Sequence, residues 1–377
     1  MKIGILTQPL MNNYGGLLQN YALQTVLKRL GHMPYTINIT YKNNWIKRIG
    51  SIIKRISQRM LGEKVRIRVW PTAKESLILS QNTRQFIKKN IKTTIEIKKK
   101  IDMKYLTKYK FDVFIVGSDQ VWRPAYSPQL STYYLSFLKN SSLPIKKLAY
   151  SASFGVDNWE YSAYLTGKYR ELIKKFDAIS VREDTAVEFC KRYFQTDTIQ
   201  TLDPTFLLNK NDYIELVDKE KNSGQEKYLF TYILDNSENN NKIVNIIAKT
   251  YKLKLRSGMP VKQFIDFGKR TLEECIFPSI SDFIQGVQQA NFVITDSFHG
   301  TVFSIIFNKP FISIANKGRG ETRFTSLLKL FNLEDRLINS PDLSSIDLLK
   351  EINWNEVNSI LKQRQEESLN FLIKNLN

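Results

Sequence analysis

Cysteine and histidine are scarce in this chain of 377 residues, which has 2 of each. The two cysteines, Cys190 and Cys275, cannot make a disulfide framework or a cysteine-rich zinc site, and such usage is typical of a reducing compartment. No stretch approaches the roughly 18–20 consecutive apolar residues of a membrane span, and the N-terminus lacks the apolar core of a signal peptide. P-loop, nucleophile-elbow and metal-cluster patterns are also missing. We therefore expect a soluble cytoplasmic protein that needs no metal and no resident cofactor.

Acidic residues are outnumbered, with 36 Asp and Glu against 56 Lys and Arg and a net charge of +20. Segment 42–110 holds twenty basic and four acidic residues, so it alone carries +16 of that charge. Residues 45–61 repeat apolar side chains at helical spacing, with Lys54, Arg55 and Arg59 between them. This pattern is typical of a helix at an anionic membrane surface, or of a helix whose apolar side packs on the core. Because no recognisable nucleic-acid-binding module accompanies the charge, we expect no nucleic-acid partner.

The length predicts two domains at roughly 100–200 residues each. An apolar strand at the N-terminus leads through a glycine-bearing loop into a helix, and further short apolar strands each end in small or polar residues. The expected strands span residues 2–7, 111–116, 147–153, 178–181, 228–234, 292–295 and 311–314. This alternation favours an α/β fold with parallel sheets that bind ligands at the carboxyl ends of their strands. We place one Rossmann-like domain at 1–205, a second at 206–350, and within 351–377 a helix that crosses back to the first.

His299 is the leading candidate for chemistry. It follows the expected strand 292–295 in a polar turn that also contains Asp296 and Ser297. An imidazole can donate or accept a proton near neutral pH. The alternative is a histidine that only fixes the following helix through hydrogen bonds. The other histidine, His32, follows a glycine at a helix end, where we expect a surface residue.

Basic residues that could hold an anion occur at two strand ends. The loop after strand 311–314 carries Lys317, Arg319 and Arg323 among glycines, and guanidinium groups suit a phosphate or a carboxylate. Arg182 follows another strand and would face the same cleft. A solvated loop is the alternative for the first group, and an ion pair with a neighbouring carboxylate is the alternative for Arg182.

Two polar turns of the first domain complete the candidate set. Residues 12–16 place backbone N–H groups at the start of a helix, where they can meet an anion, although the glycines do not form a full dinucleotide fingerprint. In the turn 117–122, Asp119 could act as a base, orient a sugar hydroxyl or cap the following segment. The candidates for an acceptor or anion loop are Asn13, Tyr14, Gly15, Gln19 and Ser118.

Seven short motifs follow one another along the chain. They are Asn-Asn-Tyr-Gly at 12–15, Leu-Gln-Asn-Tyr-Ala-Leu-Gln at 18–24, Phe-Ile-Val-Gly-Ser-Asp-Gln-Val-Trp at 114–122, Tyr-Ser-Ala-Ser-Phe-Gly at 150–155, Ile-Ser-Val-Arg-Glu at 179–183, Leu-Asp-Pro-Thr at 202–205 and Ile-Thr-Asp-Ser-Phe-His-Gly-Thr at 294–301. In this order they resemble the polysaccharide pyruvyl transferase family. The resemblance runs from residue 1 to about 337, which is nearly the whole chain.

The resemblance implies two Rossmann-like lobes similar to the GT-B glycosyltransferases, with the active site in the cleft between them. It implies transfer of pyruvate from phosphoenolpyruvate, a co-substrate, onto two hydroxyls of a sugar, which forms a cyclic ketal and releases phosphate. The histidine of the family's second-lobe turn matches His299, and the family's donor-holding arginine corresponds best to Arg182 by position. We assign catalytic roles to His299, Asp119 and Asp296, and donor binding to Arg182, Lys317, Arg319, Arg323, Ser297 and Gly300.

The family pattern does not explain segment 42–110. We expect this segment to bind the anionic inner face of the cytoplasmic membrane, where surface and capsular polysaccharides are built on polyprenyl diphosphates. The expected acceptor is therefore a lipid-linked saccharide. One alternative is a GT-B glycosyltransferase that uses a nucleotide sugar. Another is a non-catalytic protein that binds an anionic polymer or a membrane through the basic segment.

Overall fold

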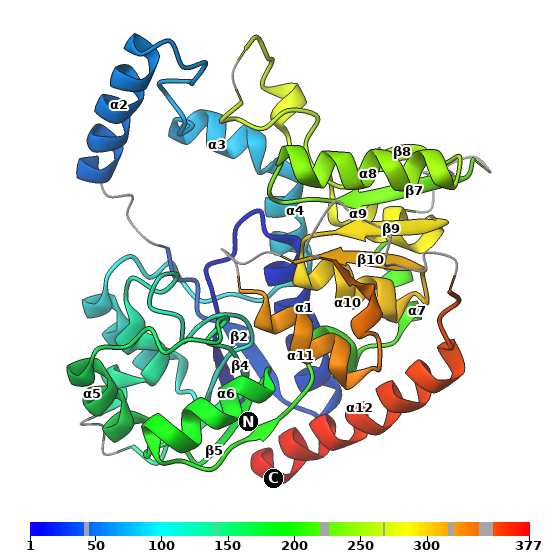
Figure 1. Ribbon diagram of the computed structural model, residues 1–377. Coiled ribbons are helices and arrows are strands. Elements are labelled where there is room, and N and C mark those ends of the chain that lie inside the picture. Colours follow the sequence, from blue (N-terminus) through cyan, green and yellow to red (C-terminus); the bar gives the residue numbers. More distant parts are fainter. Residues whose placement is uncertain are drawn as a thin grey trace.

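Two parallel β-sheets, which lie one above the other in Figure 1, form the centres of two lobes with helices on their faces. The computed structural model describes residues 1–40, 45–139, 141, 143–218, 226–266, 268–315, 320–338 and 350–377; within these ranges the side chains of 45–48 and 100–101 are not described. Because both sheets are covered on both faces, their central strands are continuous apolar runs.

The first sheet has the strand order β2-β1-β3-β4-β5-β6, and the second has the order β11-β10-β9-β7-β8. If the strands are numbered from 1 within each lobe, the second sheet, read from β8 to β11, has the order 2-1-3-4-5. The first sheet, read from β2, begins with the same order. The strands are β1 Lys2–Leu6, β2 Met33–Thr36, β3 Val113–Val116, β4 Lys146–Ala152, β5 Ala178–Val181, β6 Ile199–Gln200, β7 Tyr228–Tyr232, β8 Lys254–Ser257, β9 Phe292–Thr295, β10 Phe311–Ile314 and β11 Leu337–Ile338. The two lobes therefore repeat one topology.

Helices connect these strands and cover the sheets. The α-helices are α1 Tyr14–Arg29, α2 Trp45–Met60, α3 Ala73–Leu79, α4 Gln81–Asn90, α5 Ala163–Ile173, α6 Asp184–Phe189, α7 Lys210–Ile214, α8 Glu238–Thr250, α9 Ile280–Gln289, α10 Phe298–Ile306, α11 Thr322–Leu330 and α12 Trp354–Leu376. Short 3-10 or π turns are η1 Lys100–Tyr109, η2 Leu130–Tyr134, η3 Ser136–Leu138, η4 Cys190–Phe194, η5 Pro204–Leu207, η6 Glu273–Cys275 and η8 Glu334–Arg336. Among the described helices, none is long and apolar enough to cross a membrane.

The two lobes share one hydrophobic core. A single cluster of buried side chains contains residues of β1 and α1 together with residues of α9 and α10. At its centre the ring of Tyr14, from the first lobe, stacks 5.7 Å from Tyr232 and lies 5.2 Å from Phe283. The Tyr14 hydroxyl donates a hydrogen bond of 2.7 Å to the carbonyl of Pro278. The interface between the lobes is thus packed like an interior.

The C-terminal helix α12 returns from the second lobe to the first along the lower edge of the molecule in Figure 1. The backbone N–H of Leu202 donates to the Ser368 hydroxyl at 3.0 Å, and Lys146 donates to the Asn375 carbonyl at 2.8 Å. Phe371 of α12 is nearly buried against the same core cluster. This helix closes over the passage from the first lobe to the second.

Helix α2 projects from the body of the molecule (Figure 1). Its apolar side chains Ile49, Ile53, Ile56 and Met60 are 46%, 62%, 41% and 84% exposed. The interpretation of this segment as a helix with its apolar side on the core is therefore wrong. A helix held by packing would instead bury this stripe.

Candidate active site

A cavity of about 450 Å³ lies between the two sheets. Many of the residues that line it come shortly after β1, β3, β7 and β9 in the sequence, which are the first and third strands of each lobe. At such a point the connections of an open α/β sheet leave toward opposite faces, and ligands bind outside the carboxyl ends of the strands. Lining residues that follow these strands are Gln8, Pro9, Asp119, Gln120, Leu234, Asp296, Ser297, Phe298 and His299. Two equivalent ligand-binding edges therefore face each other across one cavity.

The N-termini of two helices meet this cavity. Asn13 is the N-cap of α1 and Ser297 is the N-cap of α10, and both residues line the cavity. Neither side chain accepts a hydrogen bond from its own helix. The first backbone N–H groups of a helix have no intrahelical acceptor, and the helix dipole makes that end positive. The cavity therefore has a favourable electrostatic environment for anions.

His299 lies in the first turn of α10 and is 4% exposed. Its Nε2 is 3.6 Å from Oδ2 of Asp203 and has no hydrogen-bond partner among the described residues. The other side of the ring rests on Gly15 of the first lobe, where an added Cβ would come within 2.0 Å of Nδ1. Gly15 is therefore required by this close approach, and the imidazole is held between two parts of the other lobe.

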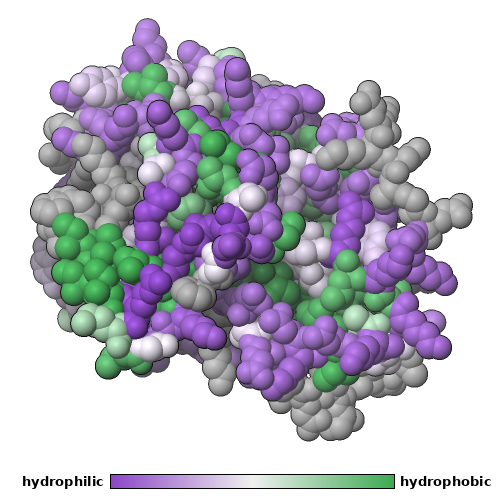
Figure 2. Space-filling view, turned by 90° about the horizontal axis from the view of Figure 1, so that it is seen from above, coloured by the Kyte–Doolittle hydropathy of each residue, from purple (hydrophilic) through white to green (hydrophobic). Residues whose placement is uncertain are grey.

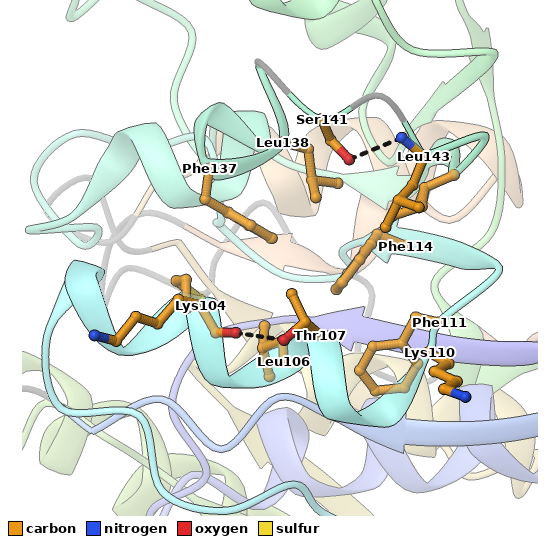
Figure 3. Close-up of a pocket in the computed structure, with 12 residues that line it drawn as sticks. Lys104, Leu106, Thr107, Lys110, Phe111, Phe114, Phe137, Leu138, Ser141 and Leu143 are labelled. Carbon is orange, nitrogen blue, oxygen red and sulfur yellow. Dashed lines mark hydrogen bonds between the residues drawn. The ribbon is translucent and has the colours of Figure 1, made fainter.

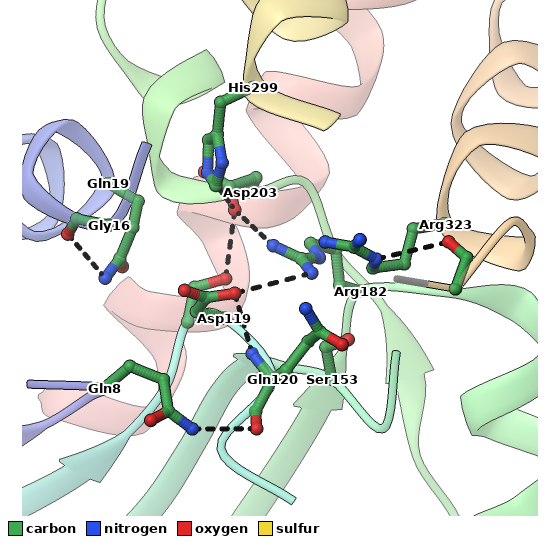
Figure 4. Close-up of polar contacts among 12 residues, drawn as sticks. Gln8, Gly16, Gln19, Asp119, Gln120, Ser153, Arg182, Asp203, His299 and Arg323 are labelled. Atoms are coloured by element: carbon green, nitrogen blue, oxygen red, sulfur yellow. Dashed lines mark hydrogen bonds and ion pairs between the residues drawn. The ribbon is translucent and has the colours of Figure 1, made fainter. Parts of the chain in front are cut away.

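Asp203 lies between His299 and Arg182, as Figure 4 shows. Its carboxylate also accepts hydrogen bonds from the Ser118 hydroxyl at 3.1 Å and from the Thr205 hydroxyl at 2.7 Å. Burial alone would raise the pKa of Asp203, but His299, Arg182 and the N–H of Thr205 together hold this pKa well below its usual range. Asp203 is thus an ionised, buried carboxylate that can orient the imidazole.

Arg182 is enclosed by carboxylates. It contacts Asp203 and Glu183 at 3.0 Å each, and Asp119 at 4.0 Å. Burial opposes the charge on its guanidinium, yet Glu183, Asp203 and Asp119 raise the pKa of Arg182 further above its ordinary value. The ring of Phe298 covers the guanidinium at 4.2 Å. Arg182 therefore positions these carboxylates. The ion pair with a neighbouring carboxylate, which was the alternative to anion binding, is present as the contact with Glu183.

Arg323 lies in the first turn of α11 and lines the cavity. The chain reaches it through Gly320, whose backbone lies so close to Gly155 of the first lobe that a Cβ would be 1.5 Å from the Gly155 carbonyl oxygen. Burial and the neighbouring charge of Arg182 lower the pKa of Arg323 to about 10. An anion in the cavity would oppose both effects, so Arg323 is suited to bind one.

The structure brings six of the expected site residues to the cavity wall. These are Asn13, Asp119, Asp296, Ser297, His299 and Arg323. The two carboxylate oxygens of Asp296 accept the backbone N–H groups of Leu234 at 2.6 Å and Asp235 at 2.9 Å. Asp296 therefore fixes the segment after β7, and Asp119 has the less constrained carboxylate of the two expected bases.

Other expected residues lie behind the wall. The hydroxyl of Ser118 donates to Asp203, Gln19 donates to Thr7 at 2.8 Å, and Tyr14 is buried between the lobes. Each of these three side chains, which we expected in an acceptor or anion loop, is engaged inside the protein and does not line the cavity. Gly300 packs against Thr295, where a Cβ would come within 2.1 Å of the hydroxyl. Lys317 and Arg319 lie outside the described residues.

Sequence reasoning missed Asp203 as a site residue. The motif Leu-Asp-Pro-Thr lies at the expected end of the first domain, and Asp before Pro is a common way to begin a helical turn. Asp203 does cap such a turn, η5. The signal that could have identified it is an acidic residue in a motif placed after the last strand of the first sheet. Its contacts with Arg182 and His299 depend on the fold.

A larger hollow of about 600 Å³ lies at the other end of the first sheet (Figure 3). Phe111 and Ile145, which precede β3 and β4, help to line it, and its walls are mainly apolar. Among the described residues that line this hollow only Lys104 and Lys110 are ionisable, so they offer no acid and base pair. The smaller cavity is therefore the candidate active site. In the described part of the chain no three His, Cys, Asp or Glu side chains are grouped to hold a metal ion.

The fold resembles those of solved GT-B enzymes. A putative UDP-N-acetylglucosamine 2-epimerase from Listeria monocytogenes superposes with a TM-score of 0.53 at 11% identity, covering 96% of this chain and 90% of that one. The UDP-GlcNAc 2-epimerase from Neisseria meningitidis bound to UDP-GlcNAc has a TM-score of 0.53 at 9% identity, covering 100% and 99%. Likeness at this identity concerns the fold alone, and it confirms the predicted GT-B-like architecture.

The family model for polysaccharide pyruvyl transferase matches residues 13–318. The chain belongs to the polysaccharide pyruvyl transferase family, and the resemblance of its seven motifs is confirmed. No curated protein matches the chain.

The carboxylates around Arg182 lead to a stability prediction. Replacing Arg182 by leucine should lower the free energy of unfolding by about 3–5 kcal/mol, because it leaves buried carboxylates without their cation. The matched control is Arg29→Leu, since Arg29 pairs with Asp212 at 2.6 Å but its side chain is 53% exposed. That change should cost no more than about 1 kcal/mol. Urea unfolding monitored by circular dichroism compares the two, and equal small losses would contradict the argument.

Proposed function

We propose that this protein transfers pyruvate from phosphoenolpyruvate onto two hydroxyls of a saccharide, forming a cyclic ketal and releasing phosphate. The observation that carries the proposal is that His299, backed by the buried Asp203, lines a cavity that also meets Arg323 and two helix N-termini. The cavity volume of about 450 Å³ lies within the range of about 300–1,000 Å³ that is usual for small-molecule sites.

The donor places two demands on the site, because phosphoenolpyruvate carries a phosphate at one end and a carboxylate at the other. Arg323 and the N–H groups at the starts of α1 and α10 are the cationic and donor groups that the cavity offers. Charge-assisted hydrogen bonds from guanidinium and from helix N-termini suit both anions. Arg182 acts behind them by holding Asp203 and Asp119.

Ketal formation needs two protons removed from hydroxyls and two delivered, one to C3 of the enol and one to the departing phosphate. A proton adds to C3 of the enol, C2 becomes electrophilic, and the first sugar oxygen bonds to C2 as its proton leaves. The C2–O bond to phosphate then breaks, and the second hydroxyl closes the ring as it loses its proton. We assign His299 the delivery of a proton to C3 or to the departing phosphate, and Asp119 the removal of a hydroxyl proton. Asp203 would stabilise positive charge on the imidazole during the transfer.

The test is phosphate release from phosphoenolpyruvate with a panel of galactose, mannose and glucose acceptors. We expect acceptor-dependent release by the native protein. In the Arg323→Ala variant the KM for phosphoenolpyruvate should rise by about tenfold or more, because a buried charge-assisted contact is lost. The matched control Arg364→Ala removes an arginine from a 40% exposed pair on α12 and should leave KM unchanged.

Two results would overturn the proposal. One is turnover of a nucleotide sugar, with release of nucleoside diphosphate and no use of phosphoenolpyruvate, which would indicate a GT-B glycosyltransferase. The other is phosphate release that does not depend on any acceptor.

A further inference from the structure

The outer surface of α2 combines an apolar stripe with flanking positive charge. Ile49, Ile53, Ile56 and Met60 recur at intervals of four, three and four residues, so they share one face of the helix. Each is more than two-fifths exposed. Leu61, which follows the helix, is 81% exposed. Single exposed apolar residues are common on proteins, but a contiguous row on a projecting helix indicates an interaction surface.

The second lobe contributes to the same surface. In the loop after β8, Val261 is 82% exposed and Ile265 is 44% exposed. This loop contacts the chain that follows α2, because Arg66 donates to the carbonyl of Asp266 at 3.1 Å and the guanidinium of Arg68 lies 5.6 Å from the ring of Phe264. The apolar tip therefore has two parts, α2 from one lobe and the 259–266 loop from the other.

Positive charge surrounds this tip. Seen from above in Figure 2, apolar side chains gather at the edge where α2 lies, and hydrophilic ones border them. The exposed basic residues of this region are Lys54, Arg59, Lys64, Arg68, Lys74 and Lys269. On α2 itself the basic positions fall on the sides of the helix away from the apolar stripe. An apolar stripe flanked by cations is complementary to a bilayer with anionic headgroups.

We propose that α2 and the 259–266 loop together seat the protein on an anionic lipid bilayer, so that the candidate active site takes a saccharide carried on a lipid diphosphate. The identity of the acceptor rests on the proposed pyruvyl transfer, whereas the bilayer contact does not. The apolar side chains enter the acyl boundary and the lysines and arginines bind lipid phosphates.

A continuous stretch of chain connects α2 to the wall of the cavity. The polypeptide passes from α2 through α3, which has 7 residues and is thus about 10 Å long, into α4. At the start of α4, Thr83 donates to the side-chain carbonyl of Asn12 at 2.8 Å, next to Asn13 of the cavity wall. Asn82 donates to the carbonyl of Phe277 in the second lobe at 2.8 Å. The stretch of chain that carries α2 is therefore anchored, through α4, beside the wall of the cavity.

The first experiment measures co-sedimentation of the full chain with vesicles of phosphatidylcholine, with or without phosphatidylglycerol, in the absence of phosphoenolpyruvate. We expect binding to the anionic vesicles at low salt, release at high salt, and little binding to the neutral vesicles. The double variant Ile53→Asp with Met60→Asp should weaken binding by about tenfold or more, since it places two carboxylates on the inserting face. The variant Val261→Asp tests the contribution of the 259–266 loop and should weaken vesicle binding by about threefold or more.

The matched control is Tyr164→Asp, which changes an equally prominent side chain, 75% exposed, on α5. This variant should bind like the native protein. Failure of the native protein to bind anionic vesicles, or equal losses in all variants, would overturn the proposal. Self-association that the Ile53/Met60 variant abolishes, without vesicle binding, would mean that the tip is an interface between copies of this chain.

The second experiment distinguishes binding to the bilayer from catalysis of pyruvyl transfer. The native protein and the Ile53/Met60 variant are compared on a water-soluble saccharide and on the same saccharide attached to a lipid diphosphate in anionic vesicles. The variant should match the native rate on the soluble acceptor and lose its advantage on the lipid-linked one. Equal rates of both proteins on both acceptors would refute the assignment of a lipid-linked substrate. Inactivity on both acceptors alongside intact vesicle binding would refute the pyruvyl transfer and leave the bilayer contact standing.

Discussion

The His299→Ala variant is expected to lose about 10²–10⁴-fold in kcat for phosphate release, which is the usual contribution of a positioned acid or base. His299 is the imidazole of the cavity wall, and its Nε2 faces the ionised carboxylate of Asp203 at 3.6 Å. The KM for phosphoenolpyruvate should change little, because Arg323 and the helix N-termini remain in place. Steady-state phosphate release at varied donor concentration separates kcat from KM.

The chain provides its own control in His32, the other histidine. The His32 ring lies 3.5 Å from the N-terminal amine, and it follows the end of α1 that is opposite to the cavity. His32→Ala should therefore retain the native kcat. The thermal melts of both variants show whether they are folded. A folded His299→Ala protein with native turnover would remove His299 from the mechanism.

The second large effect should come from adding one methyl group at Gly15. A Cβ there would lie 2.0 Å from Nδ1 and 2.2 Å from Cγ of His299, so the ring would have to leave its position beside Asp203. Because Gly15 is in the helix α1 within the shared core, its backbone has little room to yield. We expect Gly15→Ala to lower kcat by at least about tenfold, which corresponds to about 1.36 kcal/mol or more in the activation barrier.

Gly16, the next residue of α1, is the matched control. A Cβ at this position would have its nearest neighbour, Nδ2 of Asn13, at 3.5 Å, which is an ordinary contact. Alanine is favoured over glycine within a helix by roughly 0.5–1 kcal/mol, so Gly16→Ala should be at least as stable as the native protein and equally active. Parallel measurement of kcat and of the unfolding midpoint tests the pair. Native activity of Gly15→Ala would show that catalysis does not require the His299 ring to stay in its position beside Asp203.

The strands in the middle of each sheet could be predicted from the sequence. Continuous apolar runs predicted β5, β9 and β10 with their observed bounds, because a strand buried on both faces has no polar alternation. The patterns missed β2, β6, β8 and β11, and each of these lies at the edge of a sheet. Edge strands are short and partly solvated, so their composition resembles that of loops.

The site was predictable where one residue type decides the chemistry. His299 could be identified because an imidazole that follows an expected strand in a polar turn has few other uses. Of the contacts that Arg182 makes, the sequence indicated only an ion pair with a neighbouring carboxylate, because Asp119 and Asp203 reach it from turns that are distant in the chain. Arg323 looked like one of three equivalent cations, and its burial beside Arg182 depends on the fold.

The pair that would move the proton is divided between the lobes, since His299 belongs to the second and Asp203 to the first. The same is true of the ring and its support, because Gly15 is in α1 and His299 in α10. Tyr14, buried between the lobes with its hydroxyl on Pro278, holds these halves together within one core. Separating the lobes would expose that core, so the alignment of imidazole and carboxylate is established when the chain folds. Substrate then meets a preorganised site, and any loss of the interface between the lobes would also separate the imidazole from its carboxylate.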